Sequence, residues 1–239
     1  PAVEQYVECT HEYWRSNGKF TPNITLRLAS GGYIGGGLYH SQNLEGALTT
    51  LPGARIVCPS FADDAAGLLR TSMRSKGFTL YLEPKALYNS VEAAAVVPEE
   101  FEVPFGKARI RREGTDLTII TYGNTTHFCL DVAERLAREG VGSVEVIDLR
   151  SLIPLDKEAI FASVRKTGKV MVVHEDKVFS GFGAEIAAQI AGEMFRYLDA
   201  PVQRVGSTFT PVGFNPVLER AILPNDEKIY KAAKELLEF

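Results

Sequence analysis

The sequence is poor in cysteine, in long apolar runs and in excess positive charge, and each shortage excludes a class of protein. Its 239 residues include three cysteines, Cys9, Cys58 and Cys129, which is an odd number at wide spacing. This pattern fits neither a disulfide framework nor a zinc site, so we expect reduced thiols in a protein that is not secreted. No apolar run approaches membrane-spanning length and no stretch is typical of a signal peptide. A net charge of −4 argues against a nucleic-acid partner.

Apolar residues still make up 45% of the chain, which is enough to form sizeable cores in a globular protein. In the first half, apolar periodicity predicts helices and strands in alternation. The expected elements are helix 1–16, strand 23–29, helix 43–50, strand 54–58, helix 61–76 and strand 78–82. Ser60 and Asp63 are the expected cap of helix 61–76. Such alternation is typical of a parallel α/β sheet.

Residues 84–115 lack helical periodicity and contain Pro98 and Pro104, so we expect a connection between domains that returns to a strand over 107–112. The alternation then restarts. The expected elements are strand 117–122, helix 125–139, strand 144–147, helix 157–166 capped by Asp156, strand 170–173, helix 181–197, strand 202–205 and helix 225–238. The sequence therefore predicts an α/β protein of two domains, each with a mostly parallel sheet covered by helices.

A glycine-rich segment, Gly31–Gly32–Tyr33–Ile34–Gly35–Gly36–Gly37, follows the first strand and leads to His40. Glycines allow positive φ angles and close approach of the backbone to a bulky group. One interpretation is a compact surface loop in which His40 only caps the next helix. The other is a loop that presents a titratable imidazole at a cleft. The spacing matches neither a dinucleotide-binding fingerprint nor a phosphate-binding loop with its lysine.

Four motifs then occur in order along the chain: GGYIGGGLYHSQNLEGALTTLPGARIVCPSFADDAAGLL, YLEPKALY, VIDLRSLIPLD and VVHED followed by GFGAEIAAQI. Together they resemble the beta subunit, or the beta portion of a fused chain, of a branched-chain 2-oxo acid (2-oxoisovalerate) dehydrogenase. That enzyme is the thiamine-diphosphate-dependent, decarboxylating component of a multienzyme complex. The resemblance covers essentially the whole chain, and EPKALY favours the branched-chain members.

The resemblance implies a pyrimidine-binding domain over residues 1–90, a linker over 91–106 and a transketolase C-terminal-like domain over 107–239. It also implies that His40, in the HSQ motif, is catalytic and assists acyl transfer to a lipoyl group. With this resemblance, the catalytic interpretation of His40 becomes the preferred one. Ser41 and Gln42 are expected to hold the loop. Tyr33 is the predicted cofactor-binding residue, with a structural role as the alternative.

The sequence also departs from the family pattern. The family's pyrimidine-activating glutamate would precede Pro1, and the diphosphate and magnesium motif belongs to the alpha partner. We therefore expect a fragment or processed product that is inactive alone, with the ligands of thiamine diphosphate and magnesium mostly outside this chain. The positions of a potassium site in some relatives hold Ser72, Ser75 and Gly77 here, without the carboxylate, so potassium is not predicted.

The expected partners are an alpha subunit or alpha portion, a second beta copy, the lipoyl-bearing acyltransferase core and a small 2-oxo acid. Apolar residues on helices 1–16 and 181–197 favour association of two beta copies. The expected location is the bacterial cytoplasm or the mitochondrial matrix. The alternatives are a pyruvate or acetoin dehydrogenase beta subunit, or a module that serves mainly in dimerisation and docking.

The other three histidines are not expected to be catalytic. We expect His11 on an exposed helix face, His127 in a structural position and His174 in a hydrogen bond at a subunit interface. No third ligand accompanies His127 and Cys129, so no metal site is predicted. Asp148, Arg150 and Asp156 are expected to form a structural cluster of ion pairs and caps around their turn.

Overall fold

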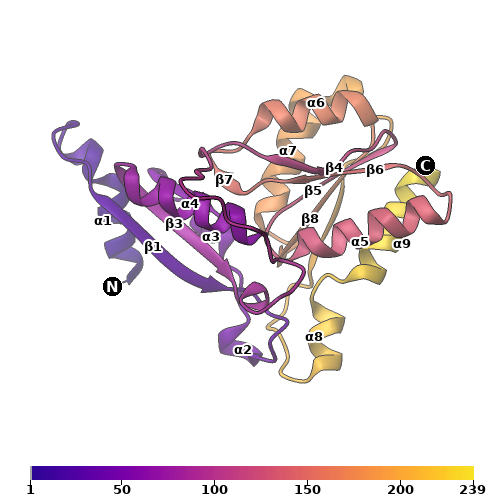
Figure 1. The fold of residues 1–239 in the computed structure, drawn as a ribbon, viewed down its shortest axis with the longest axis horizontal. Helices are drawn as coiled ribbons and strands as arrows, with labels where there is room; N and C mark the ends of the chain where they lie inside the picture. The colour runs from indigo at the N-terminus through magenta and orange to yellow at the C-terminus, as the bar shows by residue number, and fades with distance from the viewer. Residues whose placement is uncertain (1) are drawn as a thin grey trace.

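The computed structural model describes residues 2–239, which form two neighbouring β-sheets with helices packed on their faces (Figure 1). Most of the first sheet lies at the indigo and purple end of the chain, and the strands of the second sheet run from magenta to orange. Pro1, the first residue of the predicted helix 1–16, lies outside the described residues. Within residues 2–239, no helix is both long enough and apolar enough to cross a membrane.

The first sheet has the strand order β1-β3-β2-β7. Strands β1, β3 and β2 run parallel, whereas β7 pairs with β2 in the antiparallel direction. The elements of this half are α1 (Ala2–Arg15), β1 (Asn23–Ser30), α2 (Gly37–His40), α3 (Glu45–Leu48), β2 (Ala54–Val57), α4 (Ala62–Arg74), β3 (Gly77–Pro84) and the 3-10 helix η1 (Lys85–Leu87). Strand β7 (Ser151–Ile153) reaches this sheet from the second half of the chain.

The second sheet has the order β4-β6-β5-β8-β9, and only its edge strand β4 is antiparallel. Its elements are β4 (Arg109–Arg112), β5 (Leu117–Thr121), α5 (Thr125–Arg138), β6 (Val144–Asp148), α6 (Lys157–Thr167), β8 (Val170–Lys177), α7 (Phe182–Glu193), the 3-10 helix η2 (Phe195–Tyr197), β9 (Gln203–Ser207), α8 (Pro216–Ile222) and α9 (Asp226–Glu238). The predicted α/β class, with mostly parallel sheets covered by helices, is confirmed.

Alternating residues of β5 enter two different cores, as expected for a strand with helices on both faces. Leu117 and Ile119 pack with α5 and α9, whereas Ile120 packs with α6 and α7. The second of these cores continues into the first sheet, where it includes Ile56 and Leu80. The two sheets therefore share one apolar core. The predicted boundaries at residues 90 and 107 stay a prediction.

Most predicted elements are present, but several details were wrong. The predicted helix 43–50 is only the short α3, and helix α7 ends at Glu193 before a 3-10 turn. Strand β8 continues four residues past its predicted end, and the sequence analysis missed α2, α8 and β7. Ser60 does not cap α4, because its hydroxyl bonds to Thr126 and Asp148 instead.

Candidate active site

The glycine-rich segment forms a closed loop between β1 and α3. The amide of Gly31 donates to the carbonyl oxygen of Gln42 at 3.2 Å, which joins the two ends of the loop. Gly31 and Gly35 have φ angles of +84° and +64°, in the region that glycine adopts without strain. The loop includes the short helix α2, and His40 is the last residue of that helix.

His40 is exposed and lines a surface cleft with a volume of about 240 Å³. The prediction that His40 is accessible at a cleft beside the glycine loop is therefore confirmed. The remaining lining residues come from β1, α2, the loop after α2, β3 and η1: Leu28, Ala29, Ser30, Tyr39, Gln42, Leu44, Leu82 and Lys85. Most of this lining is apolar.

Lys85 is the one lysine or arginine of the cleft lining. Burial lowers the pKa of Lys85, while the nearby carboxylate of Glu175 acts in the opposite direction. Among residues 2–239, no carboxylate lies within ion-pair distance of the Lys85 ammonium. The cleft thus combines an imidazole, an ammonium group and an apolar wall, which suits a small anion with an apolar tail.

Tyr33 lies elsewhere. Its hydroxyl donates to the carbonyl oxygen of Pro224 at 2.7 Å, and its ring packs against Phe128 with centroids 5.4 Å apart. Burial raises the pKa of Tyr33 well above its ordinary value. Tyr33 is not part of the His40 cleft lining, so these contacts favour the structural alternative, and its cofactor-binding role stays a prediction.

Behind the loop, the end of β8 and the start of α3 bring three carboxyl groups together. Glu175 accepts a hydrogen bond from the Gly32 amide, and Asp176 accepts one from the Gly46 amide at 2.9 Å. Burial, with a further contribution from Asp176, raises the pKa of Glu45 to about 8. Burial also raises the pKa of Glu175 to about 7. Glu45 and Glu175 therefore keep part of their protons near pH 7.

Gln42 holds the loop, as predicted, because its amide nitrogen donates to the Leu38 carbonyl at 2.8 Å. Its amide oxygen accepts a hydrogen bond from Lys177 at 3.1 Å. Ser41 is buried, and its hydroxyl has no hydrogen-bond partner in the described part of the chain. The same role for Ser41 is therefore not supported by any hydrogen bond.

A second buried cluster joins α4 to the other half of the chain. Asp64 accepts from Arg150 at 2.8 Å and also pairs with Arg111, which binds Asp148 at 2.8 Å. Asp156 lies apart and caps α6 by accepting from the amide of Ala159. The predicted cluster around this turn thus exists, but its central acid is Asp64, which the sequence analysis did not assign to it.

The other histidines are not at the cleft. The Nε2 of His127 donates to the Ser60 carbonyl oxygen at 2.8 Å, which agrees with a structural role. His174 is fully buried by its own chain, so its predicted hydrogen bond at a subunit interface is wrong. Burial lowers the pKa of His174 to about 4, and the ring is therefore neutral at physiological pH. His11 is half-buried beside Trp14, so its predicted place on an exposed helix face is wrong.

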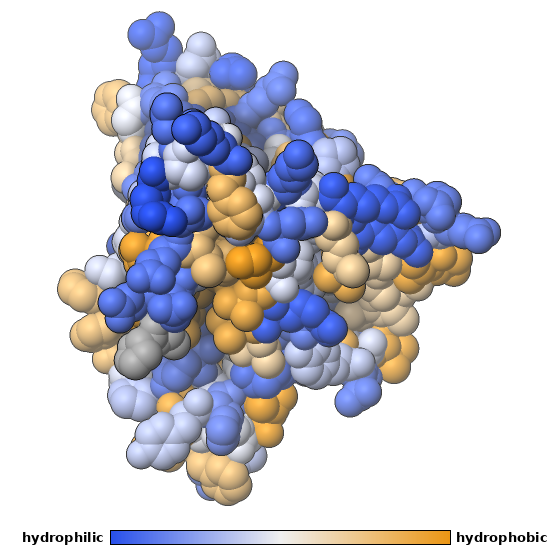
Figure 2. All heavy atoms as spheres, turned by 90° about the vertical axis from the view of Figure 1, so that its left-hand side faces the viewer, coloured by the Kyte–Doolittle hydropathy of each residue, from blue (hydrophilic) through white to orange (hydrophobic). Residues whose placement is uncertain are grey.

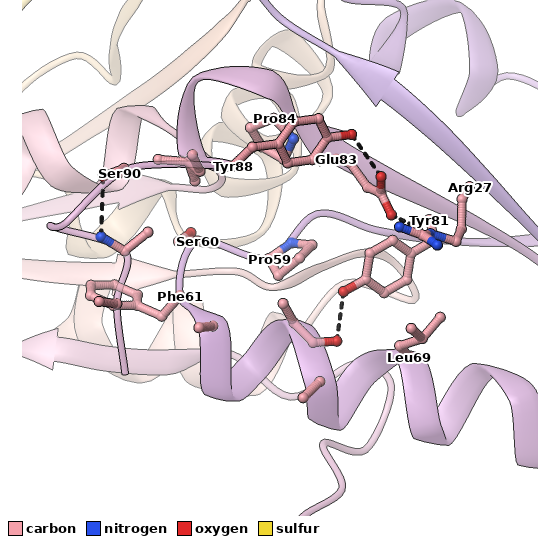
Figure 3. A pocket seen from close by; sticks show the side chains of 16 residues that line it. Arg27, Pro59, Ser60, Phe61, Leu69, Tyr81, Glu83, Pro84, Tyr88 and Ser90 are labelled. Atoms are coloured by element: carbon pink, nitrogen blue, oxygen red, sulfur yellow. Dashed lines mark hydrogen bonds and ion pairs between the residues drawn. The ribbon is translucent and has the colours of Figure 1, made fainter. Parts of the chain in front are cut away.

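A larger cavity of about 500 Å³ lies on another part of the first sheet (Figure 3). Arg27 and Tyr88 both bind the Glu83 carboxylate at its rim, and the Tyr81 hydroxyl donates to the Ala65 carbonyl of α4. The lining is otherwise mainly apolar, and it does not include His40.

Within residues 2–239, no group of three or more His, Cys, Asp or Glu side chains could hold a metal ion. At the positions that correspond to the potassium site of some relatives, the hydroxyl of Ser72 donates to the Leu68 carbonyl of its own helix.

The sequence did not predict that Lys85 lines the His40 cleft or that Asp176 and Lys177 contact its loop and the start of α3. A signal was present, because Glu175, Asp176 and Lys177 follow a buried apolar strand, where α/β sheets place functional groups. The sequence did not indicate that these side chains reach the loop of His40.

Comparison with known proteins supports the family assignment. A family model described as "Transketolase, C-terminal domain" matches residues 106–229. The 2-oxoisovalerate dehydrogenase subunit beta of Bacillus subtilis is 40% identical over 241 residues, which span 100% of this chain and 73% of that protein. The pyruvate dehydrogenase E1 component subunits beta of Bacillus subtilis and Staphylococcus aureus are 39% and 41% identical over 226 residues, or 95% of this chain and 69% of theirs.

Among solved structures, "Split gene transketolase, inactive beta4 tetramer" has a TM-score of 0.71 at 23% identity, covering 97% of this chain and 73% of that one. A transketolase mutant from Pichia stipitis has a TM-score of 0.64 at 13% identity, covering 97% of this chain and 33% of that one. At these low identities, the two solved structures show that the chain shares their fold and show nothing more.

Proposed function

Because the chain belongs to the family of 2-oxo acid dehydrogenase beta subunits, which are oxidoreductase components, we propose that it serves the decarboxylation of branched-chain 2-oxo acids and acyl transfer to lipoyl groups. The relative that matches along the entire chain acts, by its name, on 2-oxoisovalerate. Pyruvate dehydrogenase subunits match nearly as well, so pyruvate is the competing substrate.

The observation that carries this proposal is the exposed imidazole of His40 in a cleft with one ammonium group and an apolar wall. A branched-chain 2-oxo acid has the matching parts, namely a carboxylate and a branched apolar tail. Lys85 is placed to attract the carboxylate, while Leu28, Leu44 and Leu82 offer apolar surface to the tail.

His40 contributes proton transfer. The substrate carbon that keeps an electron pair after loss of CO2 attacks the disulfide of a lipoyl group. One sulfur bonds to that carbon, the S–S bond breaks, and the other sulfur leaves as a thiolate that needs a proton. An imidazolium is the side chain best suited to give that proton near neutral pH, and it then recovers the proton from solvent. Because His40 is exposed at the cleft, it can reach both the lipoyl sulfur and water.

We propose that thiamine diphosphate and magnesium find only part of their binding site on this chain. The described residues offer no metal-binding group of acids, and the His40 cleft is smaller than the roughly 300–1,000 Å³ of typical ligand pockets. We therefore propose that the alpha subunit holds most of the cofactor and that this chain forms one wall beside it.

We further propose that a second beta copy, the alpha subunit and the lipoyl-bearing acyltransferase core assemble with this chain in the bacterial cytoplasm or mitochondrial matrix. The face that carries α1 and β1 presents apolar groups among charged ones (Figure 2). Its exposed apolar residues on these elements include Val3, Tyr13, Trp14, Ile24 and Leu26. Such a surface is suited to a partner subunit.

The test is His40→Ala in the enzyme assembled with its alpha subunit, with His11→Ala as the matched histidine control. We expect transfer of the acyl group to a lipoyl domain to fall at least about 100-fold, in the range of lost general acid catalysis, with binding of the 2-oxo acid nearly unchanged. Turnover of 2-oxoisovalerate should exceed that of pyruvate. Unchanged acyl transfer in His40→Ala contradicts the proposal.

A further inference from the structure

Three consecutive charged residues at the end of β8 contact the segment around His40. Glu175 binds the Gly32 amide, Asp176 binds the Gly46 amide, and the Lys177 ammonium binds the Gln42 side chain and the Asn43 carbonyl at 3.1 and 2.9 Å. These contacts join residues at least 130 positions apart in the sequence. We propose that Lys177 is a positioning residue that fixes His40 through Gln42.

The path from Lys177 to His40 is short. Gln42 accepts from Lys177 through its amide oxygen and donates to the Leu38 carbonyl through its amide nitrogen. Leu38 and Gln42 lie two residues before and two residues after His40. The ammonium therefore holds a bridge that spans His40, and it sets the position of α2 relative to the cleft.

The surroundings show that this contact is built into the fold. A Cβ at Gly31 would lie 2.8 Å from the Glu175 carboxylate, and a Cβ at Gly46 would lie 2.3 Å from the Ser180 carbonyl. Only glycine at these two positions thus allows the loop and the start of α3 to approach β8 and the turn after it so closely. The Lys177 side chain is 21% exposed and lies 3.7 Å from Asp176, whose side chain is 5% exposed. Its ammonium balances the charge of that carboxylate, which lies behind the loop.

This inference rests on the proposed role of His40, but the positioning can be measured without any turnover. The chain has four histidines, so the His40 ring signals can be assigned in the histidine-labelled full chain by NMR with His40→Gln. We expect Lys177→Met to broaden or shift the His40 ring signals while those of His11 and His127 keep their positions.

The matched control is Lys169→Met. Lys169 lies just before the other end of β8, and its ammonium donates to the Leu237 carbonyl at 2.9 Å, so the variant loses the same kind of bond away from the loop. Gln42→Met removes the bridge from its other side and should change the His40 signals like Lys177→Met. The double variant should add little to either single change, because both remove one connection.

In the assembled enzyme, Lys177→Met should lower the rate of acyl transfer about tenfold with little change in KM for the 2-oxo acid, and Lys177→Arg should restore part of it. Unchanged His40 signals in both Lys177→Met and Gln42→Met overturn the inference, whatever the activity. If these signals change while His40→Ala transfers acyl groups normally, the positioning stands and the proposed function of His40 fails.

Discussion

Gly183, in the first turn of α7, faces the buried ring of His174 so closely that a Cβ would lie 2.2 Å from its Nε2. A Cβ at Gly181 or Gly206 would lie 2.9 or 3.1 Å, respectively, from Cε1 of the same ring. The ring therefore has little room to move away. Gly181, Gly183 and Gly206 thus leave the space that the buried imidazole of His174 occupies.

We expect Gly183→Ala to destabilise the protein by about 1–3 kcal/mol, the usual cost of overpacking a core. Helix propensity acts in the opposite direction, because alanine is favoured over glycine by up to about 1 kcal/mol in a helix. The matched control is Gly192→Ala in the same helix, where a Cβ would meet no atom within 4 Å. Urea unfolding should show the control at least as stable as the parent, and equal stability of both variants would contradict the packing argument.

The buried pair of Asp64 and Arg150 gives a second prediction. Asp64→Asn should lower the free energy of unfolding by about 3–5 kcal/mol, because it leaves the guanidinium groups of Arg150 and Arg111 buried without their shared carboxylate. The adjacent Asp63 pairs with the more exposed Arg109, so Asp63→Asn should cost less than about 1 kcal/mol. Chemical denaturation measures the free energy of unfolding of both variants. Similar decreases in the two would show that burial of the Asp64–Arg150 pair does not increase its contribution to stability.

The carboxyl cluster gives a dependence of stability on pH. The pKa of Glu45, raised to about 8 by burial, means that the folded chain keeps a proton that the unfolded chain releases above its ordinary value near 4.3. Stability from this group is present at low pH and is lost as the pH rises toward 8. The pKa of His174, lowered to about 4, acts oppositely, but only below its ordinary value near 6.5.

Between pH 6.5 and 8 the effect of His174 is absent, and loss of the Glu45 and Glu175 protons should lower stability in this range. Glu45→Gln should reduce this decline, because the amide does not ionise. The measurement is the urea midpoint at pH 6.5, 7.2 and 8.0, chosen to span the window set by the pKa values. Parallel curves for the parent and the variant would show that Glu45 does not carry the effect.

The alternation of apolar segments predicted the parallel sheets, since each strand and helix leaves a local pattern in the sequence. The run of glycines located the loop before His40, but the spacing left the exposure of His40 open, and only the family resemblance made the accessible interpretation the preferred one. The local pattern did not locate the partners of that loop, because Gln42 and Lys177 lie 135 positions apart and meet only after both sheets form. Ser60 shows the same limit. Its spacing fits a helix cap, but the buried Asp148 competes for its hydroxyl in the folded chain.

Lys85 carries the last prediction. It is the cation of the His40 cleft, and within residues 2–239 no carboxylate lies within ion-pair distance of its ammonium. We expect Lys85→Met to raise KM for 2-oxoisovalerate about 10–100-fold in the assembled enzyme, which corresponds to roughly 1.5–3 kcal/mol for a hydrogen bond to a charged group. The acyl-transfer rate at saturation should change little, because His40 is retained.

The control for this variant is Lys76→Met, which removes an exposed lysine outside the cleft lining and leaves the same net charge. Lys85→Arg should restore part of the affinity, since a guanidinium also binds carboxylates. If the cleft attracts the substrate through its carboxylate, the defect should also weaken the inhibition by isobutyrate, which shares the carboxylate and the branched tail. A rise in KM that is equal in Lys85→Met and Lys76→Met would reflect only the lost surface charge, and it would remove Lys85 from the substrate site.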